Sequence, residues 1–333
     1  MPPRGVDYIK LPTIVKTGDT TWQASTLGIS LEATLRLRSR LIEDTFSEYD
    51  PDLVLVDHMP VGALGELKPM LDRARSVTDG PRLFLGLRDV LDNPEVIRRV
   101  WTQVGGYDYL SAYDAVLVYG SPDLLDAAEE YGFNGYARRV VTCNYVAVEA
   151  DVPQQVNDDE PLILVMGGGG ADLYPVAKTF LQALPALLAE TRFRAVVLPG
   201  PNMPQADLDA LDSLASGYPV EVVHSFEDAT VWLAKASAVV MMAGYNSMCE
   251  VMSYRKKALV IPRPGPSEEQ RIRSRIFADR RLIHLLDPDD LTASRLTSAL
   301  IGLLADDRVP DPANIPALDG AKRAADVLLG DYE

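Results

Sequence analysis

Residues 161–170 read PLILVMGGGG, an apolar run followed directly by four glycines, and a helical pattern begins near Leu173. A near-continuous apolar run of this length is typical of a parallel strand that is buried on both faces of a sheet. Glycines let the backbone come close to a ligand, and the first turn of the following helix presents N–H groups to an anion. The stretch therefore predicts a parallel α/β sheet with a ligand-binding loop at the carboxyl end of this strand.

The four glycines, Gly167, Gly168, Gly169 and Gly170, match neither common phosphate-binding fingerprint. They do not form G-x-G-x-x-G, and the Lys-Ser/Thr of a P-loop does not follow them. A tight turn between strand and helix is the alternative, but one or two glycines would be enough for it. We therefore expect this loop to approach a ligand.

The same alternation of apolar runs and amphipathic stretches continues along the 333 residues. The runs predicted to be strands are 52–57, 81–87, 114–119, 138–142, 161–166, 193–198, 219–223, 237–242, 257–262 and 282–285. Helical patterns lie at 26–48, 173–190, 205–216, 245–254, 267–280, 289–305 and about 320–331. This alternation implies right-handed βαβ units in open sheets. The predicted fold class is α/β, with two doubly wound Rossmann-like domains.

Residues 147–160 (VEADVPQQVNDDEP) break the alternation, because they are polar and acidic and contain two prolines. They predict a linker between a domain at 1–150 and a second domain at 151–333. The second domain has six predicted strands. The first opens with one short strand and a polar loop before its long helix, and it lacks the usual initial strand and Gly-rich turn. We therefore expect the first domain to be N-terminally incomplete.

Composition narrows the class of partner. The chain has 32 Lys and Arg against 48 Asp and Glu, a formal net charge of -16, which argues against nucleic acid or an anionic membrane surface as the main partner. Two cysteines and three well-separated histidines predict neither a disulfide framework nor a zinc site. No apolar run approaches the roughly 20 residues of a membrane-spanning helix, and the first residues, MPPRGVDYIKLP, do not resemble a signal peptide. A cytoplasmic protein without stable membrane insertion is expected.

A second motif, AGYNSMCE at residues 243–250, also follows a predicted strand. Asn246 and Ser247 are favoured at helix starts, where they either cap the helix or hold a phosphate group. Glu250 lies about one turn further on, where a carboxylate can accept two hydrogen bonds from a ribose. The alternative for Glu250 is an acid that is favoured near the positive end of a helix dipole.

A third motif, RPGPSEEQ at residues 263–270, leaves the run that ends at 262. Two prolines make the loop rigid, Ser267 is a plausible helix cap, and Gln270 is expected to point into the same crevice from the first helical turn. Loops at the carboxyl ends of parallel strands converge on one side of the sheet. The three motifs together therefore predict one binding site.

Residues 158–306 resemble the carboxyl-terminal, donor-binding domain of GT-B glycosyltransferases of family 28. The glycine loop, the stretch Ser225-Phe226-Glu227-Asp228, AGYNSMCE and the pair Glu269-Gln270 follow the order and spacing of that family. The resemblance implies that Glu250 holds the nucleotide ribose, that Phe226 lies by the base, and that Asn246 and Ser247 lie at the diphosphate. It also implies that Glu269 and Gln270 face the sugar.

The first half of the chain carries a looser resemblance. Asp57-His58-Met59-Pro60 with Gly65-Glu66-Leu67, and Gly86-Leu87-Arg88-Asp89 with Asn93-Pro94, are similar to a bacterial group of predicted glycosyltransferases close to family 28. Members of that group usually open with a strand and a Gly-x-Gly-His loop that lines the acceptor site. This chain lacks that segment: either its start is misassigned, or the chain is truncated, or the protein has lost that part. Its acceptor site is therefore expected to be incomplete and its catalysis weak. The GT-B resemblance, together with the apolar spacing of Ala321, Ala324, Ala325, Val327 and Leu328, also implies that the last helix returns to the first domain.

The resemblance implies a glycosyltransferase that moves a sugar from a nucleotide-diphosphate sugar, with UDP expected, to an unknown hydroxyl acceptor, with inversion and without a metal or cofactor. The diphosphate charge would be met by N–H groups of the helix after Gly244 and by Arg263. Asp57 and His58, at a predicted strand end, are the candidates for the base, and the unperturbed pKa of His58 suits this role; the alternative is that His58 only packs there. Another GT-B enzyme, such as a nucleotide-sugar epimerase or hydrolase, and a noncatalytic nucleotide-sugar-binding protein are the competing hypotheses.

Overall fold

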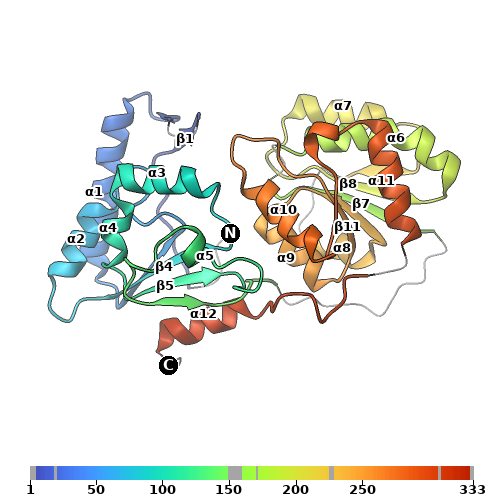
Figure 1. Ribbon diagram of the computed structural model, residues 1–333. Coiled ribbons are helices and arrows are strands. Elements are labelled where there is room, and N and C mark those ends of the chain that lie inside the picture. Colours follow the sequence, from blue (N-terminus) through green and yellow to red (C-terminus); the bar gives the residue numbers. More distant parts are fainter. Residues whose placement is uncertain are drawn as a thin grey trace. The chain divides into compact units, whose positions relative to one another are not determined.

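The computed structural model describes residues 5–18, 21–148, 160–169, 172–224, 229–306 and 309–330. The chain folds as two compact units, each built on a parallel sheet (Figure 1). Unit 1 comprises Met1–Tyr119, Asp126–Thr142 and Asp326–Glu333, and unit 2 comprises Gly120–Leu125 and Cys143–Ala325. Most of the predicted linker lies outside the described residues. The domain limits and the return of the last helix to the first domain therefore stay predictions.

Unit 2 contains a six-stranded parallel sheet in the order β12-β11-β10-β7-β8-β9. Its strands are β7 (Leu162–Met166), β8 (Arg194–Leu198), β9 (Val220–Val222), β10 (Ala238–Met241), β11 (Lys257–Val260) and β12 (His284–Leu285). Its helices are α6 (Tyr174–Glu190), α7 (Gln205–Ala215), α8 (Thr230–Lys235), α9 (Tyr245–Ser253), α10 (Glu269–Asp279), α11 (Ala293–Ala305) and the 3₁₀ helix η1 (Pro288–Asp290). The sheet is wound in two directions from the neighbouring strands β7 and β10. All six strands lie on predicted runs, so the predicted sheet is confirmed.

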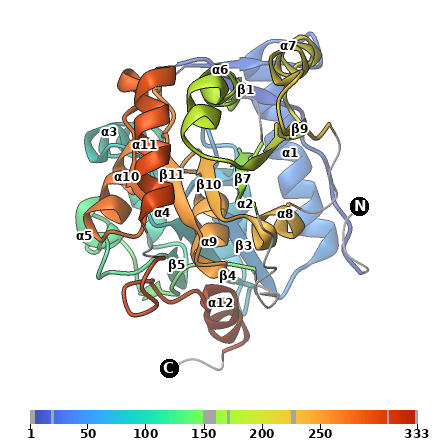
Figure 2. The same ribbon diagram turned by 90° about the vertical axis from the view of Figure 1, so that its right-hand side faces the viewer.

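Both faces of this sheet are covered by helices. Helices α6, α7 and α11 lie on one face and α8, α9 and α10 on the other (Figure 1), and α6 and α11 run side by side (Figure 2). Alternate strand residues, including Ile163, Val165, Val197 and Val240, are fully buried in the core beneath α6, α7 and α11. Burial on both faces explains why these strands read as continuous apolar runs rather than as an alternation.

Unit 1 contains a four-stranded parallel sheet whose strands follow the chain order, β3 (Leu53–Asp57), β4 (Arg82–Arg88), β5 (Ala115–Tyr119) and β6 (Val140–Thr142). Its helices are α1 (Leu31–Tyr49), α2 (Lys68–Ser76), α3 (Pro94–Val104), α4 (Gly106–Leu110) and α5 (Ala127–Glu130), and α12 (Gly320–Leu329) ends the described chain. The prediction of a single strand at the start is wrong, because β1 (Ile14–Lys16) and β2 (Trp22–Ala24) form an antiparallel hairpin. None of the described helices is long and apolar enough to cross a membrane.

Two distant segments of unit 2 are joined side by side. The N–H of Tyr145 donates to the carbonyl of Ala317 at 3.0 Å, and the N–H of Gly320 donates to the carbonyl of Tyr145 at 3.0 Å. The Nδ2 of Asn144 donates to Oδ1 of Asp319 at 2.7 Å. A Cβ at Gly320 would lie 2.6 Å from the carbonyl oxygen of Asn144, so only glycine allows this close approach.

Candidate active site

The point at which the strand order reverses in unit 2 lies between β7 and β10. In an open parallel sheet the two connections that leave such a pair run to opposite faces, which leaves a crevice at the carboxyl ends of the strands. The glycine loop leaves β7 there, and the AGYNSMCE motif leaves β10. The two strongest sequence motifs therefore meet at the place where this architecture binds ligands.

The glycines of the first loop have different roles. Gly167 is buried, and a Cβ on it would lie 3.0 Å from Cβ of Leu173, so this glycine is required by the packing of the strand against the next helix. Gly168 and Gly169 are exposed, and a Cβ on Gly168 would come no closer than 3.8 Å to its neighbours, with Oγ of Ser247 nearest. The second and third glycines thus leave open backbone beside the start of α9. Gly170 lies outside the described residues.

The start of α9 is not capped by a side chain. The N-cap residue is Gly244, with φ -61° and ψ 144°, and no side chain bonds to the first turn. Asn246, which is exposed, and Ser247, which is 4% exposed, lie inside that turn rather than at the cap. The capping alternative for these two residues is therefore contradicted. The first N–H groups of a helix have no intrahelical acceptor, so this turn offers donors to an anion.

Glu250 lies on the same helix, three residues after Ser247, and is partly exposed. Residues three apart on a helix share a face. The carboxylate therefore lies about one turn beyond the open helix start. Phe226, expected beside the base, lies outside the described residues together with the rest of Ser225–Asp228.

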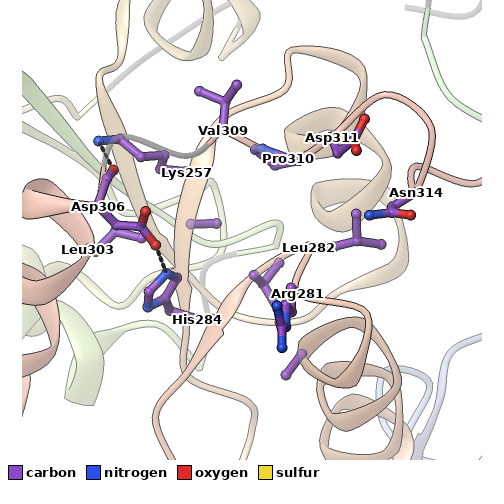
Figure 3. Close-up of a pocket in the computed structure, with 13 residues that line it drawn as sticks. Lys257, Arg281, Leu282, His284, Leu303, Asp306, Val309, Pro310, Asp311 and Asn314 are labelled. Carbon is purple, nitrogen blue, oxygen red and sulfur yellow. Dashed lines mark hydrogen bonds and ion pairs between the residues drawn. The ribbon is translucent and has the colours of Figure 1, made fainter.

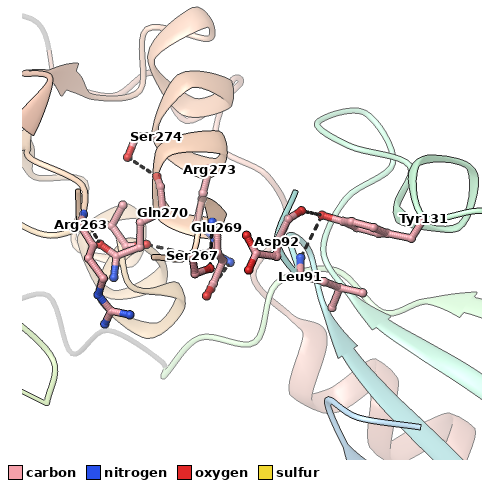
Figure 4. Close-up of polar contacts among 10 residues, drawn as sticks. Leu91, Asp92, Tyr131, Arg263, Ser267, Glu269, Gln270, Arg273 and Ser274 are labelled. Atoms are coloured by element: carbon pink, nitrogen blue, oxygen red, sulfur yellow. Dashed lines mark hydrogen bonds and ion pairs between the residues drawn. The ribbon is translucent and has the colours of Figure 1, made fainter. Parts of the chain in front are cut away.

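The loop after β11 is fastened by Gln270 (Figure 4). Oε1 of Gln270 accepts the N–H of Arg263 at 3.0 Å, and the residue is only 9% exposed. Oγ of Ser267 accepts the N–H of Glu269 at 3.3 Å, but the N-cap of α10 is Glu268, so the expectation that Ser267 caps this helix is wrong by one residue. The oxygen of Gln270 is therefore used to hold the loop, and Glu269 is the more accessible member of the pair.

Arg263 forms an ion pair that the sequence motifs did not predict. Its Nη2 lies 2.6 Å from Oδ2 of Asp172, with side-chain exposures of 37% and 49%. Asp172 follows the glycine loop, so this pair joins the loop after β7 to the loop after β11. No local pattern marks such a partner, because the two residues belong to different motifs.

Behind the loops, Arg273 of α10 is completely buried. Its Nη2 lies 2.8 Å from Oε1 of Glu269, and its Nη1 donates to the carbonyl of Ala243 at 3.0 Å. The guanidinium also lies 5.6 Å from the centre of the Tyr245 ring. In the sequence this arginine looks like an ordinary surface partner of an acid four residues earlier, so its burial was not foreseen.

In unit 1, Asp57 and His58 stand at the carboxyl end of β3, as expected. Asp57 is exposed, and the N–H of His58 donates to the carbonyl of Gly86 on β4 at 2.8 Å. His58 has φ 70°, in the left-handed region that non-glycine residues rarely occupy. Such backbone outliers cluster at functional sites, which keeps His58 a candidate.

Two acids after β4 are buried, which the sequence did not predict, although Asp89 belongs to one of the motifs that carry the resemblance. Asp89 is 2% exposed and Asp92 is 7% exposed. The hydroxyl of Tyr131 donates to the carbonyl of Asp92 at 2.9 Å and accepts the N–H of Leu91 at 3.0 Å (Figure 4). Burial raises the pKa of Tyr131 to about 12, so it stays a neutral donor. The loop is thereby fixed at the same sheet edge as His58.

A pocket of about 710 Å³ opens at the amino ends of β11 and β12, away from the carboxyl ends that carry the three motifs (Figure 3). Three of its polar side chains contact one another or the backbone: Nζ of Lys257 donates to the carbonyl of Asp306 at 2.9 Å, and Nε2 of His284 lies 3.5 Å from Oδ2 of Asp306. These contacts anchor the segment after α11. Among the described residues, no group of three His, Cys, Asp or Glu side chains is placed to hold a metal ion.

Residues 162–328 match the Glycosyltransferase family 28 C-terminal domain. The chain belongs to glycosyltransferase family 28. It is 26% identical over 174 residues to a protein of Granulibacter bethesdensis described as a UDP-N-acetylglucosamine--N-acetylmuramyl-(pentapeptide) pyrophosphoryl-undecaprenol N-acetylglucosamine transferase. The match covers 50% of this chain and 44% of that protein. A Lachnospira eligens protein of the same description is 28% identical over 150 residues, 44% of this chain and 40% of that protein. The matched region thus spans less than half of either relative.

Solved structures show the same fold over most of this family 28 chain. MurG of Acinetobacter baumannii superposes with a TM-score of 0.61 at 14% identity, covering 91% of this chain and 80% of that one. A putative UDP-N-acetylglucosamine 2-epimerase of Listeria monocytogenes gives a TM-score of 0.61 at 13% identity, covering 92% and 80%. At these identities the likeness concerns the fold, which is that of GT-B glycosyltransferases.

Proposed function

We propose that this chain transfers a sugar from a nucleotide-diphosphate sugar, with UDP as the nucleotide, to a hydroxyl acceptor. The observation that carries the proposal is the uncapped start of α9 beside exposed Gly168 and Gly169, at the switch point of a family 28 donor domain. The names of the curated relatives, which include a UDP sugar, support the choice of UDP.

In the proposed complex the diphosphate lies against the first turn of α9, with N–H groups of Asn246 and Ser247 as donors and Arg263 as the cationic partner. Glu250 accepts the ribose hydroxyls, and Glu269 accepts hydroxyls of the sugar. These groups stabilise the negative charge of the leaving nucleotide. They support transfer without a metal, because the diphosphate charge meets a helix start and a guanidinium.

The transfer itself would be a direct displacement. The acceptor oxygen bonds to the anomeric carbon while the bond to the diphosphate breaks, which inverts that carbon, and the acceptor proton passes to a base. We assign the base to His58 or Asp57, because both stand at the carboxyl end of β3 and His58 has a left-handed backbone. We also propose a cytoplasmic setting, which is supported by the two buried cysteines, Cys143 and Cys249, because neither forms a disulfide.

The proposal is tested by titrating UDP into the protein in a calorimeter and by following UDP release from UDP sugars with hydroxyl acceptors, with and without a chelator. Glu250→Ala should weaken UDP binding about 5- to 150-fold, because it removes hydrogen bonds worth roughly 1–3 kcal/mol. Glu190→Ala, at the far end of α6, is the matched control. Unchanged affinity in folded Glu250→Ala would return Glu250 to a helix-terminal role.

The competing functions predict different products. An epimerase or hydrolase would change or release the sugar without an acceptor, and a binding protein would bind UDP without turnover. The fold likeness to a putative epimerase favours examining the sugar product directly. Acceptor-dependent UDP release would identify transfer. Its loss in only one of Asp57→Asn and His58→Asn would identify that residue as the base, and its loss in both would show that both residues are needed.

A further inference from the structure

A completely buried arginine is costly, because its guanidinium loses its hydration on burial. Hydrogen bonds and an acidic partner within the protein must replace those contacts with water. Arg273 therefore has a strong requirement for its partners. Two of these belong to the proposed donor site: the carboxylate of Glu269, at 2.8 Å, and the carbonyl of Ala243, at 3.0 Å (Figure 4 shows the α10 side of this arrangement).

The two partners lie on different motifs. Ala243 directly precedes Gly244, the N-cap of α9, whereas Glu269 begins α10. The planar guanidinium has separate donors at fixed angles, so one side chain sets the distance and direction between these two motifs. The third contact, with the ring of Tyr245 at 5.6 Å, holds the first residue of α9 as well.

Glu269 is the member of the network that reaches solvent. Its side chain is 23% exposed while that of Arg273 is 0% exposed. Oε1 lies 2.8 Å from Nη2 of the guanidinium, so the carboxylate is held at one end while part of the side chain stays open to solvent. A carboxylate held in this way offers one fixed acceptor to a sugar hydroxyl.

We propose that Arg273 is a positioning residue for the donor sugar: it fixes the carboxylate of Glu269 relative to the diphosphate-binding start of α9. This inference rests on the proposed function and adds to it a residue that does not touch the donor. Since Arg273 acts through Glu269, its loss should affect the part of the affinity that the sugar contributes more than the part contributed by UDP.

The experiment compares calorimetric affinities for UDP and for UDP-glucose, UDP-galactose and UDP-N-acetylglucosamine, taking the sugar that adds most affinity in the wild type. Arg273→Lys keeps the positive charge but removes the planar guanidinium that can donate to two partners at once. It should reduce the extra affinity contributed by the sugar about 5- to 50-fold, while the affinity for UDP changes less than about threefold. Glu269→Gln should have the same effect, and the double variant should lose no more than either single one.

Arg271→Lys is the matched control. Arg271 is on the same helix and also pairs with acids, Asp287 at 3.0 Å and Asp289 at 2.9 Å, but these follow β12 and belong to none of the three motifs assigned to the donor. It should leave both affinities unchanged. If the wild type binds no UDP, the proposed function fails and this inference with it. Three outcomes would overturn the inference alone. UDP binds but no sugar adds affinity, or Arg273→Lys lowers the affinity for UDP as much as it lowers the gain from the sugar. The third outcome is that the losses caused by Arg273→Lys and Glu269→Gln are additive in the double variant. Should Arg273→Lys not fold, an unchanged gain from the sugar in Glu269→Gln would overturn it.

Discussion

Asp172 competes with the diphosphate for Arg263, so removing its charge should tighten UDP binding. The substitution Asp172→Asn breaks the 2.6 Å ion pair and leaves the guanidinium available. An exposed pair of this kind contributes about 0.2–1 kcal/mol, which UDP must otherwise overcome. A phosphate on the other side of the guanidinium would lie about 6 Å from the Asp172 carboxylate, and the repulsion between them in water is about 0.7 kcal/mol.

These contributions sum to about 0.9–1.7 kcal/mol, or a Kd for UDP about 5- to 20-fold lower in Asp172→Asn. The measurement is calorimetry with UDP at low and high salt, and the gain should shrink as salt screens the charges. Glu190→Gln is the control: it removes the same charge from the last residue of α6, about 24 Å along the helix from Tyr174. Unchanged or weaker UDP binding in Asp172→Asn would show that the pair orients Arg263 for the nucleotide. An equal gain in the control would reduce the effect to net charge.

Three further outcomes concern stability and reactivity. Gly320→Ala should lower the free energy of unfolding by about 1–3 kcal/mol, because its Cβ would lie 2.6 Å from the carbonyl oxygen of Asn144; urea unfolding measures this, and a neutral result would show that the two segments can separate. Trp101→Ala should cost about 3–5 kcal/mol in unit 1, since the ring is fully buried against Phe133; an unchanged urea midpoint would contradict this. Burial raises the pKa of Cys143 to about 11, so its alkylation by iodoacetamide should be slow at pH 8 and rise tenfold per pH unit toward pH 11, whereas the unfolded thiol should level off near its usual pKa of 9.0; fast alkylation in the folded protein at pH 8 would count against burial.

The sheets were predictable because their strands are buried on both faces. DLVLVD at 52–57 and PLILVM at 161–166 each contain a continuous apolar run, and the strands begin and end within a residue of those limits. The hairpin β1–β2 was not predictable in the same way. Its three-residue strands have no buried residue, so neither shows the apolar pattern by which strands are recognised.

The site was predictable only where a motif follows a strand. The start of α9 and the loop after β11 lie where AGYNSMCE and RPGPSEEQ placed them. The contacts Arg263–Asp172 and Arg273–Ala243 join segments that are distant in the sequence. Such pairs depend on how the helices and strands pack together. Residue types and their spacing within one segment do not show which distant segment it will contact.

The side-by-side pairing of Asn144–Val146 with Ala317–Gly320 brings together the two ends of the segment that contains both the donor motifs and their supporting residues. A segment with adjoining ends can be exchanged as one insert without stretching either junction. The segment between these paired ends, residues 144–320, is therefore a natural cassette for recombination, in evolution or in the laboratory. If the proposed donor site is right, grafting the corresponding segment of another family 28 member at these two junctions should change donor preference.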